Sequence, residues 1–360
     1  MKIGILTYHR SHNYGALLQA IALRKVLSDM GHEVTFIDYW PAYHQHRYAL
    51  FSFASLKYRN IRGNLGYIKI CLKNRKCRKD RINNFNIFIS EYIEPHLSST
   101  NEKYDLVIHG SDQIWRKQLE LRTYNPVYFG NHNIQTVKKI SYAASMGMLP
   151  ENNADKLTVK KLLSNLDSIS VREIALKELC KSLGYTGTRQ DVDPTLLLSS
   201  SEWISMYRLQ KNSKVERYAL YYKITDSFDI GLLQKFVASK GLKLKIIYHM
   251  AVCKSTDENI TTADPRQFLD LIYNASYVFT SSFHGLVFAL LFHKPFYASF
   301  TQNSERAASL LETLNISGYL LNPKTVIPTN VQAIDYDIVD SQLKHLRFSS
   351  IDFLSEISKG

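Results

Sequence analysis

The sequence predicts an α/β protein made of two Rossmann-like domains that face a cleft, with mostly parallel sheets. Apolar strand patterns alternate with helical patterns along most of the chain, as in sheets covered by helices on both faces. The chain has 360 residues, more than a single hydrophobic core usually supports. Its composition, 45% hydrophobic and 21% charged, is that of an ordinary globular protein. We therefore expect two domains with the chemistry between them.

The N-terminal half opens with a β-α-β pattern. A strand is expected at residues 2–7, a helix follows from 16 to 27, Gly31 suits its end, and the next strand covers 34–37. Further strands are expected at 105–109, 140–144 and 168–171, with helices at 154–166 and 173–183. This domain should span residues 1–190 and contain a basic insertion at about 43–100.

The C-terminal half repeats the alternation after a boundary at Asp193-Pro194. Strands are expected at 218–222, 244–248, 277–280 and 295–298, separated by helices. Asp264 is suited to cap a helix at 266–274. Pro265 is suited to the first turn of that helix, where its missing amide N–H costs no hydrogen bond. The second domain should cover 191–330, and a helical segment 331–360 completes the chain. Whether that segment packs across the first domain stays open.

The formal net charge of +13 and a pI near 9.3 indicate an anionic partner. Between residues 57 and 81 one acidic residue, Asp80, faces a set of lysines and arginines: Lys57, Arg59, Arg62, Lys69, Lys73, Arg75, Lys76, Arg78, Lys79 and Arg81. Apolar and aromatic residues are interspersed: Tyr58, Leu65, Tyr67, Ile68, Ile70 and Leu72. Two interpretations stay open, a basic amphipathic helix on an anionic membrane and a solvated helical insertion. Nucleic acid is not expected, because no recognisable reading motif accompanies the charge.

A cytoplasmic protein is expected, with peripheral contact at the inner face of the membrane as an option. The first residues lack a leader pattern, and the apolar stretch 286–292 is about a third of the length that crosses a bilayer. The four cysteines show no metal-site or disulfide spacing, so reduced, structural thiols are expected.

Polar clusters follow the predicted strands, where open α/β sheets bind their ligands. In the loop 8–15, Arg10 lies ahead of a helix N-terminus and favours an anion. Ser111, Asp112 and Gln113 offer hydrogen-bonding groups, and Trp115 offers an aromatic face, a combination typical of sugar binding. The alternatives are a polar connection without a ligand and an Asp112 helix cap.

Two further clusters come later in the chain. Arg172 ends a strand, where its guanidinium could bind phosphate or carboxylate or simply pair with Glu173. In residues 280–286, hydroxyl groups, His284 and a glycine gather at a helix N-terminus, which suits anion binding with proton transfer. A lone histidine is more often structural, and His293 is interpreted so.

Five motifs in register resemble the polysaccharide pyruvyl transferase family over nearly the whole chain. They are Asn13-Tyr14-Gly15, Gly110-Ser111-Asp112-Gln113-Ile114-Trp115, Ser170-Val171-Arg172-Glu173, Asp193-Pro194-Thr195 and Ser282-Phe283-His284-Gly285, followed by Lys294-Pro295-Phe296. The resemblance implies a GT-B-like fold. It also implies transfer of a pyruvyl group from phosphoenolpyruvate to a sugar of a surface polysaccharide or its lipid-linked precursor, as a ketal, without a cofactor or a metal.

The resemblance also implies residue roles. His284 is the expected general acid, which protonates the enol carbon of the donor. The donor side is expected to include Arg172, Ser281, Ser282, Gly285, Arg306 and Arg10, and the acceptor side Asn13, Tyr14, Ser111, Asp112, Gln113 and Trp115. Several branches of the family carry Arg-Leu-His at this loop. Here Ser282 stands in place of that arginine, whose donor contact therefore does not carry over.

Two other functions are compatible with the same cleft. A GT-B-type glycosyltransferase would use a sugar nucleotide and release a nucleoside diphosphate. A non-catalytic glycan-binding protein would bind sugar without turnover. Release of inorganic phosphate from phosphoenolpyruvate distinguishes pyruvyl transfer from both.

Overall fold

The first domain is built on a parallel five-stranded sheet. The computed structural model describes residues 1–53, 56, 60–212, 217–249, 256, 258–302, 304–328 and 333–358. The sheet order is β3-β2-β1-β4-β5, with every pair parallel. The strands are β1 (Lys2–Leu6), β2 (Glu33–Ile37), β3 (Leu97–Ser98), β4 (Lys103–His109) and β5 (Gln135–Ser141). β1 lies at the centre, where its apolar run is buried between β2 and β4.

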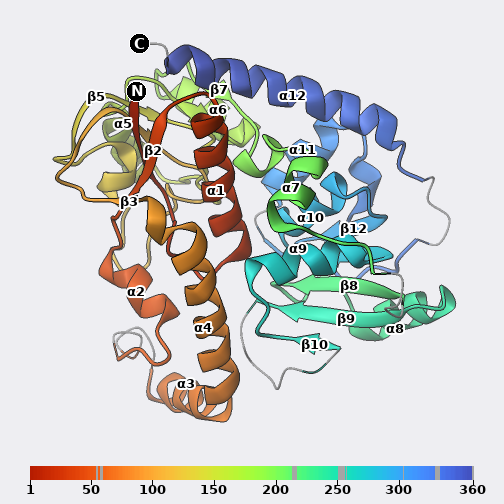
Figure 1. Cartoon of the computed structure of the whole chain (residues 1–360). Coiled ribbons are helices and arrows are strands. Elements are labelled where there is room, and N and C mark those ends of the chain that lie inside the picture. The colour runs from red at the N-terminus through yellow and green to blue at the C-terminus, as the bar shows by residue number, and fades with distance from the viewer. Residues whose placement is uncertain are drawn as a thin grey trace.

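The second domain contains a parallel six-stranded sheet in the order β10-β9-β8-β11-β12-β13. The strands are β8 (Tyr218–Lys223), β9 (Lys243–Tyr248), β10 (Asn259–Ile260), β11 (Tyr277–Thr280), β12 (Phe296–Ser299) and β13 (Leu320–Leu321). The two sheets lie in separate halves of the molecule (Figure 1). Two Rossmann-like domains of this kind form the expected GT-B-like α/β architecture.

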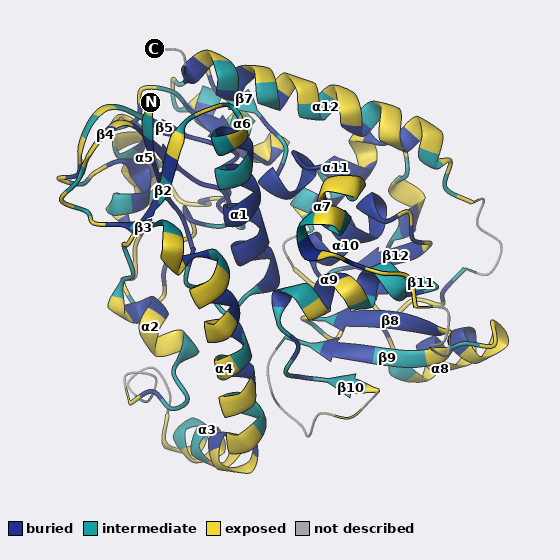
Figure 2. Ribbon diagram, in the orientation of Figure 1, coloured by how far each residue is buried: buried dark blue, intermediate teal, exposed yellow. Residues whose placement is uncertain are grey.

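Helix α1 (Tyr14–Asp29) lies at the junction of the domains and is buried along most of its length (Figure 2). Its apolar side chains face several directions, as in a helix covered on all sides. Outside the basic insertion, the first domain also contains the α-helices α5 (Asn153–Leu163) and α6 (Ile174–Ser182). A short parallel pair, β6 (Ser170–Val171) and β7 (Arg189–Gln190), follows α5 and flanks α6.

Most helices of the second domain begin after a residue whose side chain caps the first turn. They are α7 (Ser200–Tyr207), α8 (Ile230–Ser239), α9 (Pro265–Asn274), α10 (Phe283–Leu291) and α11 (Glu305–Thr313). Asp264 caps α9 in a capping box with Gln267, and Pro265 takes the first position, as predicted. Ser282 caps α10 by accepting a hydrogen bond from the amide of Gly285.

The basic insertion is helical, as predicted, but it forms three helices. These are α2 (Ala42–Tyr48), α3 (Ile61–Lys73) and α4 (Arg75–Tyr92). α4 leads away from the sheet and α3 lies at the far end of this arm (Figure 1). Lys57, Tyr58 and Arg59 of the basic stretch lie outside the described residues.

One predicted strand was misplaced. β5 covers Gln135–Ser141 rather than 140–144, and Ala143 has a φ of 44°, which no strand residue adopts. Only the end of β5 is strongly buried, so its first residues lack the apolar run expected of a parallel strand. Residues 143 and 144 instead belong to a loop that bridges to Val171.

The C-terminal helix α12 (Tyr336–Ile357) joins both halves of the molecule (Figure 1). The hydroxyl of Tyr336 donates to the carbonyl of Lys294 in the second domain. Further along, the hydroxyl of Ser350 accepts from the amide of Val192, and Arg189 donates to the carbonyl of Ser349. The helix therefore does pack back to the end of the first domain. Among the described helices, none is both long and apolar enough to span a membrane.

Candidate active site

Asp193 lies at the centre of a buried cluster between the domains. Its carboxylate oxygen Oδ2 accepts a hydrogen bond from Nη1 of Arg172, at the end of β6, and lies 3.4 Å from Nε2 of His284, on α10. The other oxygen, Oδ1, accepts from the amide and hydroxyl of Thr195, at 3.0 and 2.6 Å. Burial opposes ionisation of Asp193, but the positive charges of His284 and Arg172 and these hydrogen bonds lower its pKa well below the usual range. Asp193 is therefore a carboxylate that holds a histidine and an arginine together.

A second arginine lies beside the first. Nε of Arg306, on α11, is 3.8 Å from Oε1 of Glu173, and Nε of Arg172 is 4.0 Å from the same oxygen. The hydroxyl of Ser145 also donates to that oxygen. Both guanidinium groups lie over the ring of Phe283, 5.0 and 5.3 Å from its centroid. We call Arg172, Glu173, Asp193, His284 and Arg306 the arginine cluster.

The arginine cluster has more hydrogen-bond donors than the protein satisfies. Nε and Nη2 of Arg172 and Nε of Arg306 are buried, and none has a hydrogen-bond acceptor among the described residues. Burial, and then the like charge of Arg172, lower the pKa of Arg306 to about 10. Unpaired buried donors are costly, and guanidinium groups bind carboxylate and phosphate in a fork geometry. The arrangement therefore suits an anion with several oxygens.

His284 is positioned by close packing between the two domains. A Cβ atom on Gly15, in the first turn of α1, would lie 1.8 Å from Nδ1 of His284, so only glycine allows this contact. A Cβ atom on Gly285 would lie 2.2 Å from the hydroxyl of Thr280, which explains the glycine after the histidine. The side chain of His284 is 8% exposed. These contacts fix the ring beside Asp193.

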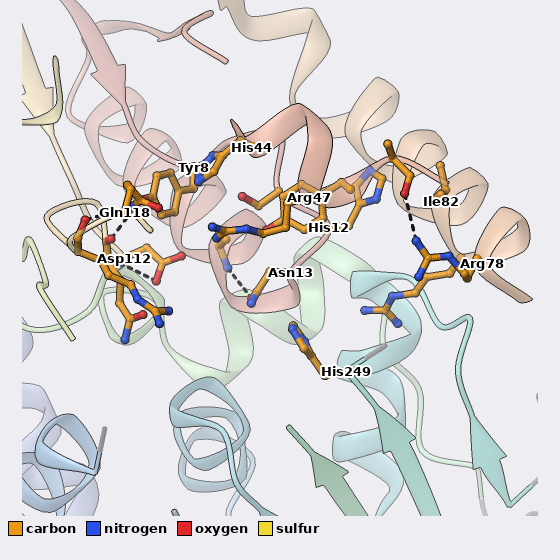
Figure 3. Close-up of a pocket in the computed structure, with 17 residues that line it drawn as sticks. Tyr8, His12, Asn13, His44, Arg47, Arg78, Ile82, Asp112, Gln118 and His249 are labelled. Carbon is orange, nitrogen blue, oxygen red and sulfur yellow. Dashed lines mark hydrogen bonds between the residues drawn. The ribbon is translucent and has the colours of Figure 1, made fainter. Parts of the chain in front are cut away.

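A cavity of about 340 Å³ opens next to the arginine cluster. Figure 3 shows Asn13 and Asp112 from the first domain, with His249 reaching in from the end of β9. Asn13 caps α1 by accepting from the amide of Ala16. Asp112 lines this cavity, and its charge acts on both Arg172 and Arg306. The cavity lining comprises Tyr8, Ser11, His12, Asn13, Ala16, His44, Arg47, Tyr48, Ala49, Arg78, Arg81, Ile82, Asp112, Gln113, Arg116, Gln118 and His249.

The cations of this cavity are arginines, while its histidines are neutral. Burial lowers the pKa of His12 and His249 to about 4 and that of His44 to about 3. Arg81 donates from Nη1 to the hydroxyl of Tyr14 and the carbonyl of Thr261. Its Nη2 is buried without an acceptor in the described part of the chain. The cavity thus favours a ligand that is both polar and anionic.

The family model for polysaccharide pyruvyl transferases matches residues 13–301. The chain belongs to the polysaccharide pyruvyl transferase family. No curated protein matches it. Among solved structures, similar ones include a UDP-GlcNAc 2-epimerase of Methanocaldococcus jannaschii, with 10% identity, TM-score 0.48 and full coverage of both chains. The glycosyltransferase SnogD of Streptomyces nogalater has 11% identity and TM-score 0.43, with 100% of this chain and 99% of that one covered.

In this pyruvyl transferase family member, the structure brings together His284, Arg172 and Arg306, while Asn13, Asp112 and Gln113 line the adjoining cavity. Ser282 and Gly285 form the turn that starts α10. These members of the two predicted groups therefore meet at the domain junction, and others do not. Their binding roles stay predictions.

Three predicted binding residues are engaged within the protein. Both oxygens of Asp38 accept from Arg10, at 2.8 and 2.9 Å, away from the arginine cluster. The hydroxyl of Ser281 accepts from the amides of Ile224 and Thr225 and thereby braces the end of β8. The ring of Tyr14 stacks on a neighbouring aromatic ring with a centroid distance of 4.4 Å. None of the three has a side chain free for a ligand in this conformation.

Two more of the predicted binding residues lie in the core of the first domain. Trp115 is completely buried, stacks on Phe129, and donates from Nε1 to the carbonyl of Tyr128. It presents no ring face to the cavity, so it cannot act as a sugar platform in this conformation. The hydroxyl of Ser111 donates to the carbonyl of Ala143 and is equally buried.

Sequence reasoning missed most of the cavity lining, including three arginines of the insertion and one histidine. Arg47, Arg78 and Arg81 come from the insertion, and His249 follows β9. The rule that ligands bind at the carboxyl ends of strands would have selected His249. No local signal shows that one face of the basic stretch turns towards the cleft. Among the described residues, no group of histidine, cysteine and acidic side chains is suited to hold a metal ion.

Proposed function

We propose that this protein transfers a pyruvyl group from phosphoenolpyruvate to a sugar and forms a ketal. The observation that carries the proposal is the arginine cluster. Two arginines with unpaired N–H groups lie beside a histidine held by a buried carboxylate, at the junction of two domains. Membership of the polysaccharide pyruvyl transferase family supports the same reaction class.

The donor fits the cluster by charge. Phosphoenolpyruvate carries a carboxylate and a phosphate close together. Arg172 and Arg306 offer two guanidinium groups over the same ring, Phe283. Each guanidinium can bind one anionic group of the donor. The bound negative charges then relieve the repulsion between the two arginines.

The proposed chemistry begins with proton transfer. The imidazolium of His284, stabilised by the carboxylate of Asp193, donates a proton to the methylene carbon of the donor. The electron pair of the C=C bond forms the new C–H bond, and the adjacent carbon becomes electrophilic. One sugar hydroxyl attacks that carbon and loses its proton. The C–O bond to phosphate then breaks, a second hydroxyl closes the ketal with loss of its proton, and inorganic phosphate leaves. The arginines stabilise the charge on the leaving phosphate.

The acceptor belongs in the adjoining cavity. Asn13 and Gln113 can hydrogen-bond sugar hydroxyls, and Asp112, whose charge also acts on both arginines of the cluster, is the candidate to accept a hydroxyl proton. Arg78 and Arg81 lie in the same cavity and suit a phosphate attached to the sugar. The proposed acceptor is therefore a sugar phosphate of the lipid-linked class. This substrate and a phosphoenolpyruvate donor imply a cytoplasmic reaction.

The reaction is tested with purified protein, phosphoenolpyruvate and a panel of free and phosphate-linked glycosides. We expect phosphate release together with a product that has gained one pyruvyl ketal, measured by mass spectrometry. His284→Gln should lower the rate by about 10²–10⁴-fold, the usual contribution of a positioned acid. His293→Gln is the matched control, because His293 pairs with Asp340 on the surface.

Two results would contradict the proposal. Near-normal turnover by His284→Gln would remove the proposed acid. Absence of any product from phosphoenolpyruvate, together with release of a nucleoside diphosphate from a sugar nucleotide, would assign the cleft to glycosyl transfer.

A further inference from the structure

Helix α3 forms the tip of the helical arm and lies far from both sheets (Figure 1). It has 13 residues, which makes it about 20 Å long. Asn60 caps its first turn by accepting from the amide of Gly63. The helix is therefore stabilised by its own N-terminal cap and by one packed face, and not by packing against the cores of the two domains.

The packed face of α3 contacts the preceding loop. The ring of Tyr67 lies 5.5 Å from that of Phe51, and the side-chain amide of Asn64 donates to the carbonyl of Leu56. Cys71 is buried on the same side. The orientation of the helix on the arm is therefore set by these contacts.

The face beside the packed one carries an apolar stripe. Ile61, Leu65, Ile68 and Leu72 recur at intervals of four, three and four residues, which places them along one line of the helix. Ile61 is 81% exposed, Leu65 65% and Leu72 69%, and Ile68 is half-buried. We call these four residues the α3 stripe. Exposed apolar side chains are common singly, but an aligned set on a protruding helix marks a contact surface.

Basic residues border the α3 stripe on one side. Arg62, Lys69 and Lys73 each follow a stripe residue by one position, and all three are exposed. None forms a salt bridge with any residue that the structure describes. α3 contains no acidic residue. The surface is therefore apolar along the α3 stripe and cationic along one of its two borders.

We infer that α3 docks on an anionic lipid bilayer, with the α3 stripe among the acyl chains and Arg62, Lys69 and Lys73 at the lipid phosphates. A short amphipathic helix with this division of charge lies in the plane of a membrane interface. Anionic lipid complements the cationic border, since each lysine or arginine near such a surface is attracted to it. Attachment at α3 also brings α4 to the interface, where Arg78 lines the cavity one turn after the helix begins.

The test uses the full-length protein and sedimentation with vesicles of phosphatidylcholine alone or mixed equally with phosphatidylglycerol. We expect binding to the mixed vesicles that weakens as salt is raised. Arg62→Gln, Lys69→Gln and Lys73→Gln together should lower the partition coefficient on the order of 100-fold. Leu65→Ser with Leu72→Ser should lower it at least about tenfold, because less apolar surface enters the lipid.

The matched control lies on α5. Leu157 is 66% exposed there, and Lys160 and Lys161 are exposed beside it. Leu157→Ser with Lys160→Gln and Lys161→Gln removes one exposed leucine and two exposed lysines, and this variant should bind vesicles like the parent. Circular dichroism and melting temperature confirm that each variant is folded.

Three results would overturn the inference. The first is failure of the parent protein to bind the mixed vesicles. The second is equal loss in the α5 control and the α3 variants, which would make the attraction a property of net charge alone. The third is a parent dimer in analytical ultracentrifugation that the Leu65→Ser, Leu72→Ser variant abolishes, which would assign the α3 stripe to a second copy of the chain. The outcome is independent of the proposed reaction.

Discussion

At the scale of single residues, Arg306 carries a charge that the folded protein disfavours. Burial and the charge of Arg172 lower its pKa to about 10, so the charged guanidinium costs stability at every pH below that value. Arg306→Met keeps an apolar chain over Phe283 and removes the charge. We expect a melting temperature equal to or a few degrees above that of the parent without ligand.

Phosphoenolpyruvate should no longer stabilise the Arg306→Met variant. Saturation at about 100 times Kd stabilises a protein by about 2.7 kcal/mol, which raises the melting temperature by several degrees. We expect that rise with phosphoenolpyruvate for the parent and not for Arg306→Met, measured by calorimetry. Arg24→Met is the control, because the Nε of Arg24 is also buried without an acceptor among the described residues, in a different part of the molecule. A full ligand-dependent rise in Arg306→Met would remove Arg306 from the donor site.

At the scale of elements, the first turns of α1 and α10 meet at Gly15 and His284. Gly15→Ala places a methyl group where the imidazole lies, so the ring must move or the helices must separate. We expect transfer to fall on the order of 100-fold, because a catalytic group displaced by about 1 Å loses that much. Stability should fall by about 1–3 kcal/mol, as in overpacked cores.

Gly66→Ala provides the comparison for this prediction. Gly66 is helical, on α3, and nothing lies within 4 Å of the Cβ atom it would gain. This change should preserve transfer to a soluble acceptor and stabilise the helix by about 0.5–1 kcal/mol. Phosphate-release rates and urea unfolding measure both effects. If Gly15→Ala turned over as fast as Gly66→Ala, the position of His284 against α1 would not matter for the reaction.

Elements with a strong buried pattern could be predicted from sequence, and elements defined by their neighbours could not. β4, β8 and β11 have apolar runs that only a covered sheet strand explains, and each was predicted within two residues. β10 and β13 have two residues each, too few for any periodicity. They are the edge strands of the sheet, and their pairing depends on the outer backbone groups that β9 and β12 present to them.

The same distinction holds for the site. Arg172, Asp112 and His284 lie at strand ends, so topology alone predicted that they would gather. Arg81 reaches the cavity because α4 crosses the domain junction, and nothing in its local sequence states this. Trp115 follows polar residues in a loop, yet Tyr128 and Phe129 bury it from a position more than ten residues away. Burial of a loop residue is decided by distant segments that a local pattern does not contain.

At the scale of the whole molecule, buried histidines make stability depend on pH. Burial lowers the pKa of His44 and of His109 to about 3, against 6.5 in an unfolded chain. Both imidazoles are neutral when folded, so below pH 6.5 the unfolded chain binds the additional protons. The contribution of these neutral histidines to the stability of the fold is therefore present above pH 6.5 and is lost as the pH falls towards their pKa in the folded protein. At pH 5 the loss is on the order of 2 kcal/mol for each histidine.

Urea unfolding at pH 7.5, 6 and 5 measures this dependence. We expect a nearly constant free energy of unfolding down to about pH 6.5 and a steep fall below it. His12, His132 and His249 act in the same direction, because their pKa values are lowered to about 4. His44→Phe retains an aromatic ring against Tyr8, whose centroid lies 4.2 Å away, and should reduce the loss between pH 6.5 and 5 by about 2 kcal/mol. A free energy of unfolding that stays level from pH 7.5 to 5 would mean that water reaches these imidazoles in the folded protein, and the neutral, arginine-dominated character of the cavity would then have to be abandoned.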